Sequence, residues 1–461
     1  MSPDSETNPH ESPETPPESP AVDVQALTFA GCVLVLITAF LGWMFAGMQM
    51  AVTSLVMHNA ASTLLIENAD GGEVTKGEIG QWFGFLVCAF LMGAATGGYL
   101  FGWVGDRIGR SKAMAMSILC YSLFAGLTWF ARTPEELFLL RFLTCMGIGG
   151  MWPNGIALVS EAWPNISRPF LAGAIGTAAN VGILLFATMT LYIHVTPETW
   201  RWTMLFGLAP AVLGVFAWFC VPESPRWLAL RERSEENEKP RLAVGMSEVF
   251  RPPLLKVTVI GILLGAVPLF GGWGVSNWAT AWASENAETS KSEEHNETEE
   301  TKKQDPTLKS WSVIYRSLPG SISSLLGGAV AMLLGRRRFY FILCLCALVC
   351  TQFLFRLDSP TDEGFKIWMG LLGFFSGFFF GWLPLCLPEL FPTRVRSTGA
   401  GVSFNFGRIL TTIGVLASAF MLKAWLKGSY TTVGQICGLV YAVGLIVIWF
   451  APVSESTELE D

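Results

Sequence analysis

The chain has 461 residues, of which 51% are hydrophobic and 15% are charged, and its formal net charge is −7. A water-soluble domain of this size could not bury so much apolar surface in one core, so the composition excludes an ordinary soluble protein. The acidic residues concentrate in the tails and in one loop, which indicates solvation of these segments rather than a surface for an acidic partner.

Apolar segments recur along the chain, and each is long enough to cross about 30 Å of hydrocarbon as a helix. Residues 1–24 are rich in Pro, Ser and Glu and hold no Lys or Arg, so we expect a disordered tail there rather than a signal peptide. The apolar runs are continuous, which argues against a β-barrel. The predicted membrane-spanning helices are 27–57, 81–104, 112–131, 135–160, 168–194, 201–221, 254–283, 313–334, 339–355, 366–389, 397–422 and 431–451.

These twelve segments fall into two groups of six. The charged segment 222–253 is predicted to be a linker between an N-terminal bundle at 25–221 and a C-terminal bundle at 254–452, with a tail at 453–461. Basic residues concentrate in one set of loops, whereas residues 284–310 are dominated by Glu. Because Lys and Arg near span ends are retained in the cytoplasm, we expect the basic loops and both termini inside the cell and the acidic loop outside. A plasma membrane or bacterial inner membrane is the expected location.

A short motif recurs at equivalent places in the two halves. Its first copy follows the second span and its second copy follows the eighth, with the same spacing of glycines and of the following arginine. Such a repeat is typical of a duplicated transporter. The two copies contain Gly102, Asp106, Arg107, Gly109 and Arg110, and Gly328, Met332, Gly335 and Arg336.

The first copy resembles the signature loop of the major facilitator superfamily, and four further motifs resemble its sugar-porter and metabolite-symporter branches. These are Arg141 with the Gly147–Gly150 stretch, Ser160-Glu161 followed by Arg168, Pro222–Leu228 with Glu223 and Arg226, and Pro388–Ser397 with Glu389, Arg394 and Arg396. The resemblance covers nearly the whole chain. It implies an all-α membrane fold of two pseudo-symmetric six-helix bundles that moves a small polar metabolite by alternating access.

The charged loops predict a conformational latch. Asp106 can lie at the N-terminal end of a neighbouring helix, and the arginines beside it can pair with acids at other helix ends. In the family, similar networks hold the halves together while the site faces outward, and they separate when it opens inward. Anchoring to the inner membrane face and helix capping are the alternative. The predicted latch residues are Gly102, Asp106, Arg107, Gly109, Arg110, Glu161, Arg168, Glu223, Arg226, Glu389, Arg394 and Arg396.

Polar and aromatic side chains near the middle of the spans are the candidate substrate-binding residues. Arg408, with Asn405 one turn earlier, could bind a carboxylate or phosphate, or it could be a structural arginine bonded to carbonyl groups. The other candidates are Gln49, Arg141, Trp152, Asn154, Asn180, Asn277 and Trp278, each of which could instead serve helix packing. The histidines lie apart from other metal ligands, so we expect neither a metal nor a cofactor.

The chain departs from proton-coupled relatives because carboxylates are missing from the expected places. Ala46 lies in the first-span stretch where relatives carry an acid, Met151 follows a glycine pair where Glu occurs in relatives, and Met332 replaces the aspartate of the first repeat. Proton coupling needs a group that alternates between charged and neutral forms. Facilitated diffusion, exchange or coupling through the charge of the ligand therefore compete with proton symport, which is the family default.

Two arginines without an evident acidic partner, Arg141 and Arg408, favour a small organic anion as substrate, with a sugar as the alternative. A sensor or receptor that keeps the fold but does not transport is the second functional class. The sequence shows no phosphate-binding, zinc-protease or hydrolase motif, so we do not expect an enzyme. The expected partners are the substrate, membrane lipid and, under symport, a proton; we expect a monomer that binds no nucleic acid.

Overall fold

The computed structural model describes residues 27–69, 72–163, 168–236, 246–292, 307–392, 395–426 and 428–452. Helices make up most of these residues, and twelve helical segments are long and apolar enough to cross a membrane, which confirms the predicted number. The predicted tails at 1–24 and 453–461 and most of the acidic loop at 284–310 lie outside the described residues.

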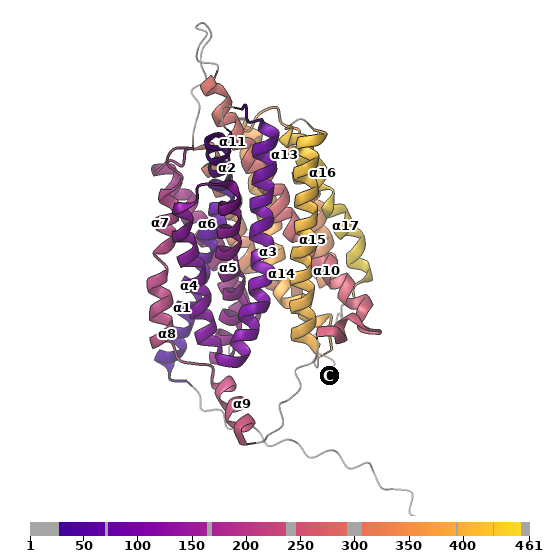
Figure 1. Cartoon of the computed structure of the whole chain (residues 1–461). Coiled ribbons are helices and arrows are strands. Elements are labelled where there is room, and N and C mark those ends of the chain that lie inside the picture. The colour runs from indigo at the N-terminus through magenta and orange to yellow at the C-terminus, as the bar shows by residue number, and fades with distance from the viewer. Residues whose placement is uncertain are drawn as a thin grey trace, which may run out of the picture.

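The first six spans form one bundle (Figure 1). Helix α2 continues the first span past a break at Val56, and α7 and α8 together form the sixth span. The helices are α1 (Phe29–Leu55), α2 (Met57–Glu67), α3 (Lys76–Ile108), α4 (Arg110–Leu127), the short turn η1 (Thr128–Phe130), α5 (Pro134–Ala162), α6 (Arg168–Tyr192), α7 (Trp202–Leu208) and α8 (Ala211–Cys220).

The second bundle follows the connecting elements α9 (Pro225–Glu236) and η2 (Met246–Phe250). Its helices are α10 (Leu254–Phe270), the π-helical turn η3 (Gly271–Val275), α11 (Ser276–Ser292), α12 (Leu308–Leu334), α13 (Arg336–Leu354), α14 (Glu363–Glu389), α15 (Arg396–Ala424), α16 (Tyr430–Gly438), α17 (Val440–Val447) and η5 (Ile448–Phe450). Helix α9 lies at one end of the bundles and α2 and α11 at the other, so we name these the α9 end and the α2 end (Figure 1).

Local signals in the sequence explain where several helices begin and end. Thr75 and Glu78 form a reciprocal capping box at the start of α3. Gly109, with a φ of 112°, ends α3 and turns the chain directly into α4, and Gly335, with a φ of 83°, does the same between α12 and α13. Only glycine adopts this left-handed conformation without strain. The repeated motif therefore encodes the same tight turn in both halves.

Glycines let the helices within each bundle approach closely. A Cβ atom at Gly97 of α3 would lie 1.8 Å from the carbonyl oxygen of Met146 in α5, and one at Gly373 of α14 would lie 2.1 Å from that of Arg316 in α12. Lipid gives little hydrophobic drive for helix association, so close backbone packing of small residues supplies much of it. The helix pairs α3–α5 and α12–α14 hold equivalent positions in the two halves.

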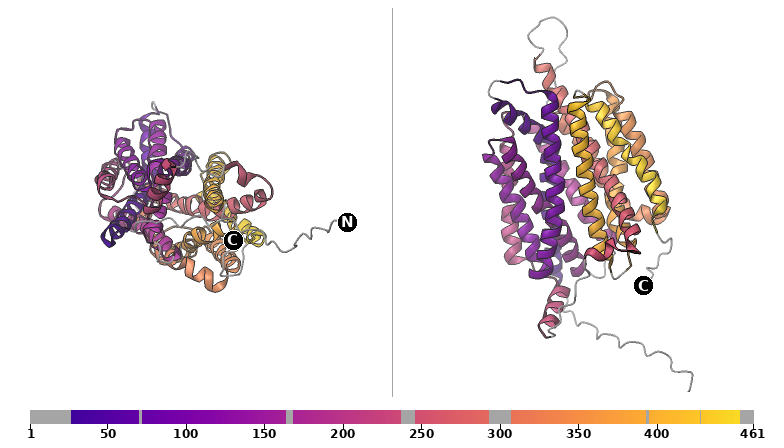
Figure 2. Two further views of the ribbon diagram at one scale, coloured as in Figure 1. Left: turned by 90° about the horizontal axis from the view of Figure 1, so that it is seen from below. Right: turned by 45° about the vertical axis from the view of Figure 1, so that its right-hand side comes forward.

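The two bundles stand side by side, with the N-terminal half in indigo to magenta and the C-terminal half in rose to yellow (Figure 2). Helix α6 packs against α12, and α3 packs against α15, so these two helix pairs form the main contacts between the bundles. Smaller contacts join α6 to α14, and α1 to α11 and α12. A ligand carried between the halves would bind at this interface.

Candidate functional site

The bundles are joined by polar contacts toward the α2 end. Each contact pairs a residue of the first bundle with one of the second, and together they connect four different helix pairs. The contacts are Ser54 Oγ donating to Asn277 Oδ1 at 2.5 Å, His58 Nε2 with Tyr430 Oη at 3.3 Å, Thr190 Oγ1 with Ser310 Oγ at 2.9 Å, Lys309 Nζ donating to the Val195 carbonyl at 2.6 Å, and Lys423 Nζ with Glu78 Oε1 at 3.4 Å. The interior is therefore sealed at the α2 end.

Toward the α9 end the same bundles separate. Helices α3 and α15 contact each other from their α2-end turns to mid-span, where Arg408 donates to the carbonyl of Ala94 at 3.1 Å. One turn further on, a Cβ atom at Gly98 would still lie 3.1 Å from Asn405. Beyond that point, a Cβ atom at Gly102 or at Gly401 would meet nothing within 4 Å. The two helices have diverged, so the interior opens toward the α9 end.

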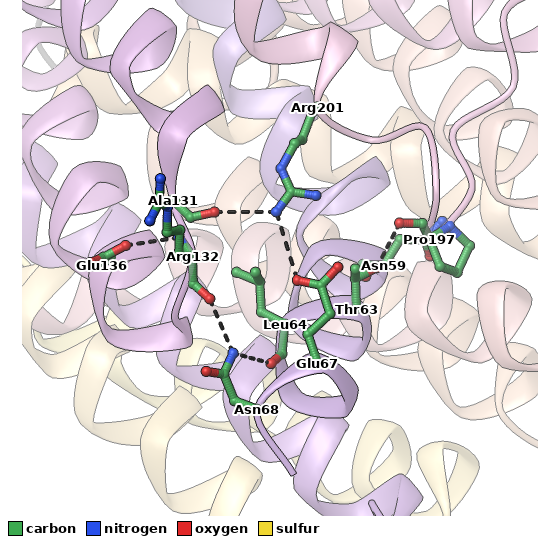
Figure 3. A network of polar contacts seen from close by, with 10 residues as sticks. All are labelled: Asn59, Thr63, Leu64, Glu67, Asn68, Ala131, Arg132, Glu136, Pro197 and Arg201. Carbon is green, nitrogen blue, oxygen red and sulfur yellow. Dashed lines mark hydrogen bonds and ion pairs between the residues drawn. The ribbon is translucent and has the colours of Figure 1, made fainter. Parts of the chain in front are cut away.

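A second polar network ties α2 to the loops of its own bundle (Figure 3). Arg201 forms an ion pair with Glu67 at 3.9 Å, and Asn68 donates to the carbonyl of Arg132 at 3.0 Å. Thr63 donates to the Pro197 carbonyl at 2.6 Å. Helix α2 is thus fixed to the first bundle, and its contact with the second bundle through His58 has to break when the α2 end opens.

The charged latch residues pair within each bundle at the α9 end. Asp106 bonds to Arg110 at 2.7 Å, and Glu389 bonds to Arg336 at 2.7 Å. Arg107 lies over the ring of Trp103, at 3.9 Å from its centroid.

Two further acids of the predicted latch accept hydrogen bonds from serine residues, and neither pairs with an arginine side chain that the structure describes. Glu223, rather than Asp106, lies at the N-terminus of α4, where it accepts from the backbone N–H of Ser111 at 3.0 Å. Glu161 accepts from the hydroxyl of Ser224. Arg226 is exposed on α9, while Arg394 and the side chains of Arg168 and Arg396 lie outside the described residues.

Arg141 is fully buried inside the first bundle. Its guanidinium donates to the backbone carbonyl of Gln49 at 3.1 Å, to the side-chain oxygen of Gln49 at 3.4 Å and to the hydroxyl of Thr53 at 3.0 Å. All three acceptors are neutral. Within the described part of the chain, this buried arginine therefore bonds to no carboxylate.

Three predicted substrate-binding residues lie in packed contacts. Asn154 is buried and donates to the carbonyls of Phe101 and Gly150, both at 2.9 Å, which joins α5 to α3. Asn277 belongs to the α2-end seal, and the buried Trp278 donates to Ser418 at 3.2 Å. In this state these side chains support helix packing or closure, and none of them faces open space.

Arg408 occupies the middle of the interface. Besides the Ala94 carbonyl, it bonds to Asn405 Oδ1 at 3.2 Å and lies over the ring of Phe404, at 4.7 Å from its centroid. Only one of its three guanidinium nitrogens makes these hydrogen bonds. Arg408 thus links the two bundles through a carbonyl group and still has donors available for an anion. These are the two roles that the sequence left open.

Two predicted residues remain half-buried near mid-span, Trp152 of α5 and Asn180 of α6. The Trp152 ring packs against that of Trp43, with centroids 4.9 Å apart. Asn180 makes no hydrogen bond within the part of the chain that the structure describes. The structure adds Arg316 of α12, which was not among the predicted residues and is also half-buried. The available signal was a charged residue inside an apolar segment.

Comparison with known proteins places these features in a family. The family model described as "Sugar (and other) transporter" matches residues 27–244, and the model described as "Major Facilitator Superfamily" matches residues 297–460. A putative metabolite transport protein of Haemophilus influenzae is 25% identical over 427 residues, which cover 90% of this chain and 94% of the relative. A cis,cis-muconate transport protein of Acinetobacter baylyi is 23% identical over 365 residues, covering 78% of this chain and 84% of the relative.

Among solved structures, the xylose transporter XylE from Escherichia coli in a partially occluded inward open conformation matches with a TM-score of 0.69 and 19% identity. The match covers 93% of this chain and 100% of the other. The relatives are transporters and not enzymes, in agreement with the sequence analysis. The two family models, the twelve spans in two bundles and the shared fold lead to one conclusion: the chain belongs to the major facilitator superfamily, among its sugar and metabolite transporters.

Proposed function

We propose that the chain moves a small organic carboxylate across a membrane by alternating access. The observation that carries the proposal is an excess of positive charge at mid-span. Arg141, Arg316 and Arg408 lie away from the ends of their spans, whereas the acids within the twelve described spans lie in terminal turns. A charge in the membrane is costly without a counter-charge, so a mobile anion is the natural partner. Similarity to a protein named for cis,cis-muconate, a dicarboxylate, supports this substrate class.

We also propose that the α9 end faces the cytoplasm. The basic residues beside the spans gather there, including Arg107, Arg110 and Arg336, and such residues are retained on the cytoplasmic side. On this orientation, the sealed α2 end and the separated α9 end correspond to an inward-facing state. The pairing of latch residues within each bundle agrees with that state.

The proposed transport cycle does not use a proton at the pair formed by Arg141 and Gln49. A glutamine side chain neither gains nor loses a proton in the physiological range, so this pair stays the same at every working pH. Coupling through the charge of the substrate, exchange or facilitated diffusion fits this arrangement better than symport through the first span.

Placing a carboxylate in this pair tests that view. We expect Gln49→Glu to make transport depend on pH, because the new carboxylate can hold a proton or pair with Arg141. The measurement is initial uptake into proteoliposomes from about pH 5 to about pH 8, which spans the usual range of perturbed carboxylates. The isosteric control is Gln49→Met, whose profile should follow the wild type. A Gln49→Glu profile that overlays the wild type would contradict the proposal.

The function itself is tested by uptake of labelled cis,cis-muconate, with xylose as the neutral comparison. We expect the wild type to take up muconate and the Arg408→Gln variant to lose about tenfold or more of the rate, because the variant has no charged donor for the carboxylate at this point of the interface. Arg408→Lys should keep part of the rate, since it keeps the charge but not the planar fork. Arg356→Gln changes an exposed arginine and serves as the control.

Uptake of xylose without uptake of any carboxylate would overturn the anion proposal. A wild-type protein that binds a ligand tightly but gives no flux would favour the sensor or receptor.

A further inference from the structure

Arg316 lies on the face of α12 that points into the protein. The opposite face carries Leu318 and Ile322, which are 52% and 56% exposed, as expected of side chains that meet lipid. On the side of Arg316, Gly320 and Ser323 are buried, and the Arg316 backbone packs against Gly373 of α14. Arg316 nevertheless keeps partial exposure. Its accessible part therefore faces space between the helices.

The Arg316 guanidinium has no hydrogen bond or ion pair with another residue that the structure describes. The guanidinium nitrogens of Arg316 are not fully buried, so solvent reaches them. Arg141 and Arg408, in contrast, are both bonded to protein acceptors. A guanidinium at this depth is stable when it meets an anion or water. Of the three arginines inside the spans, Arg316 therefore has the most hydrogen-bond donors available for a ligand.

The pairing of α6 with α12 fixes the offset between Asn180 and Arg316 along the helix axes. Thr190 bonds to Ser310, and a Cβ atom at Gly176 would lie 3.7 Å from the hydroxyl of Ser324, so the two helices run antiparallel in step. This register sets Asn180 opposite residue 320. Arg316 is four residues further toward the α2 end, which is one helical turn or about 6 Å along the axis.

Asn180 has the same two features as Arg316. It is half-buried although its neighbours one turn away, Gly176 and Ile183, are buried, and it too lacks a hydrogen bond to another described residue. A flat apolar surface lies beside it, because a Cβ atom at Gly176 would be 3.8 Å from the six-membered ring of Trp152. The structure thus places a cation on α12, an amide on α6 and an aromatic face on α5, the three kinds of group that a planar acid needs.

We propose that Arg316 is the principal anchor for the carboxylate of a planar unsaturated or aromatic acid. Its planar fork can donate two parallel hydrogen bonds to one carboxylate. The Asn180 amide bonds to a second polar group of the same ligand, and the Trp152 ring packs against its flat apolar part. This assignment rests on the proposed function, since it names the site at which the carboxylate binds.

The experiment compares ligand binding by the purified wild type with binding by Arg316→Gln and Arg316→Lys. The probes are benzoate, its uncharged analogue benzamide, and cis,cis-muconate, each titrated by calorimetry and by thermal shift. We expect Arg316→Gln to weaken benzoate and muconate binding by about tenfold to a hundredfold and to change benzamide binding by less than about threefold. Arg316→Lys should be intermediate. A matched loss for Arg356→Gln, an exposed arginine, is not expected.

A second readout separates ligand binding from a structural role. Because Arg316 forms no hydrogen bond or ion pair with a described residue, Arg316→Gln without ligand should melt at or above the wild-type temperature. A clear fall in melting temperature, or equal carboxylate binding by the wild type and Arg316→Gln, would overturn the assignment and leave the proposed function standing. Failure of the wild type itself to bind any of the carboxylates would remove the proposed function, and this assignment with it.

Discussion

Gly97→Val should prevent the protein from folding into its native bundle. A Cβ atom at Gly97 would lie 1.8 Å from the carbonyl oxygen of Met146 and 2.5 Å from its carbonyl carbon, and both atoms belong to the backbone of α5. Neither atom can move away without displacing the helix. We expect a loss of more than about 4 kcal/mol, the range of severe overpacking, which few proteins tolerate. The measurement is the yield of monodisperse protein and its melting temperature after extraction.

The matched control lies on the same helix. Gly102→Ala should fold normally, because a Cβ atom there meets nothing within 4 Å and alanine favours the helix over glycine by about 1 kcal/mol. A Gly97→Val protein that purifies as a single species and melts within a few degrees of the wild type would mean that α3 and α5 do not pack backbone to backbone.

A wedge at Gly102 should stop transport without stopping folding. In the present state, Gly102 of α3 and Gly401 of α15 mark the point where the two helices diverge, with open space beside each. Closure of the α9 end has to bring the α9-end halves of α3 and α15 together, in the same way as the two helices already meet at Ala94 and Arg408. A tryptophan at Gly102 would occupy the space that closure needs. We expect uptake to fall by more than about tenfold, equivalent to more than about 1.4 kcal/mol against the closed state.

The control for this prediction is Leu100→Trp, on the exposed face of α3, where the side chain is already 41% exposed. It adds the same bulk to the same helix, so it should transport at close to the wild-type rate. Ligand binding by Gly102→Trp should persist, because the interior stays open toward the α9 end. Normal uptake by the tryptophan variant would show that closure does not bring α3 and α15 together at this level.

The sequence predicted the spans well because long apolar runs and left-handed glycines are local signals. The predicted segment 339–355 and the observed helix α13 (Arg336–Leu354) differ by a few residues. The spacing at Gly109 and Gly335 anticipated two equivalent turns. The break at Val56 was not predicted, because neither glycine nor proline marks it. Tertiary contacts of α2 with the first bundle, such as Thr63 with Pro197, set its direction instead.

The site was less predictable, since polarity at mid-span does not reveal which side chains meet. Arg316 was overlooked because the eighth span was expected to begin at residue 313, where a nearby arginine would reach the membrane surface. The helix begins five residues earlier, at Leu308, which places Arg316 about two turns from its start. Asn277 and Asn180 looked alike in sequence, yet Asn277 bonds across the bundles to Ser54 while Asn180 keeps its amide free among the described residues.

Alternating access is tested most directly by using electron spin resonance to measure two distances between the bundles, one at each end of the protein. Labels at Ile108 and Leu255 report the α9 end, and labels at Ile66 and Trp425 report the α2 end; all four side chains are exposed. The three cysteines that are not buried, Cys120, Cys220 and Cys346, would first be replaced by serine. Alternating access of the two bundles predicts that substrate shifts the α9-end pair toward shorter distances while the α2-end pair lengthens. Two distances that rise together, or that stay fixed while the labelled protein transports, would contradict it.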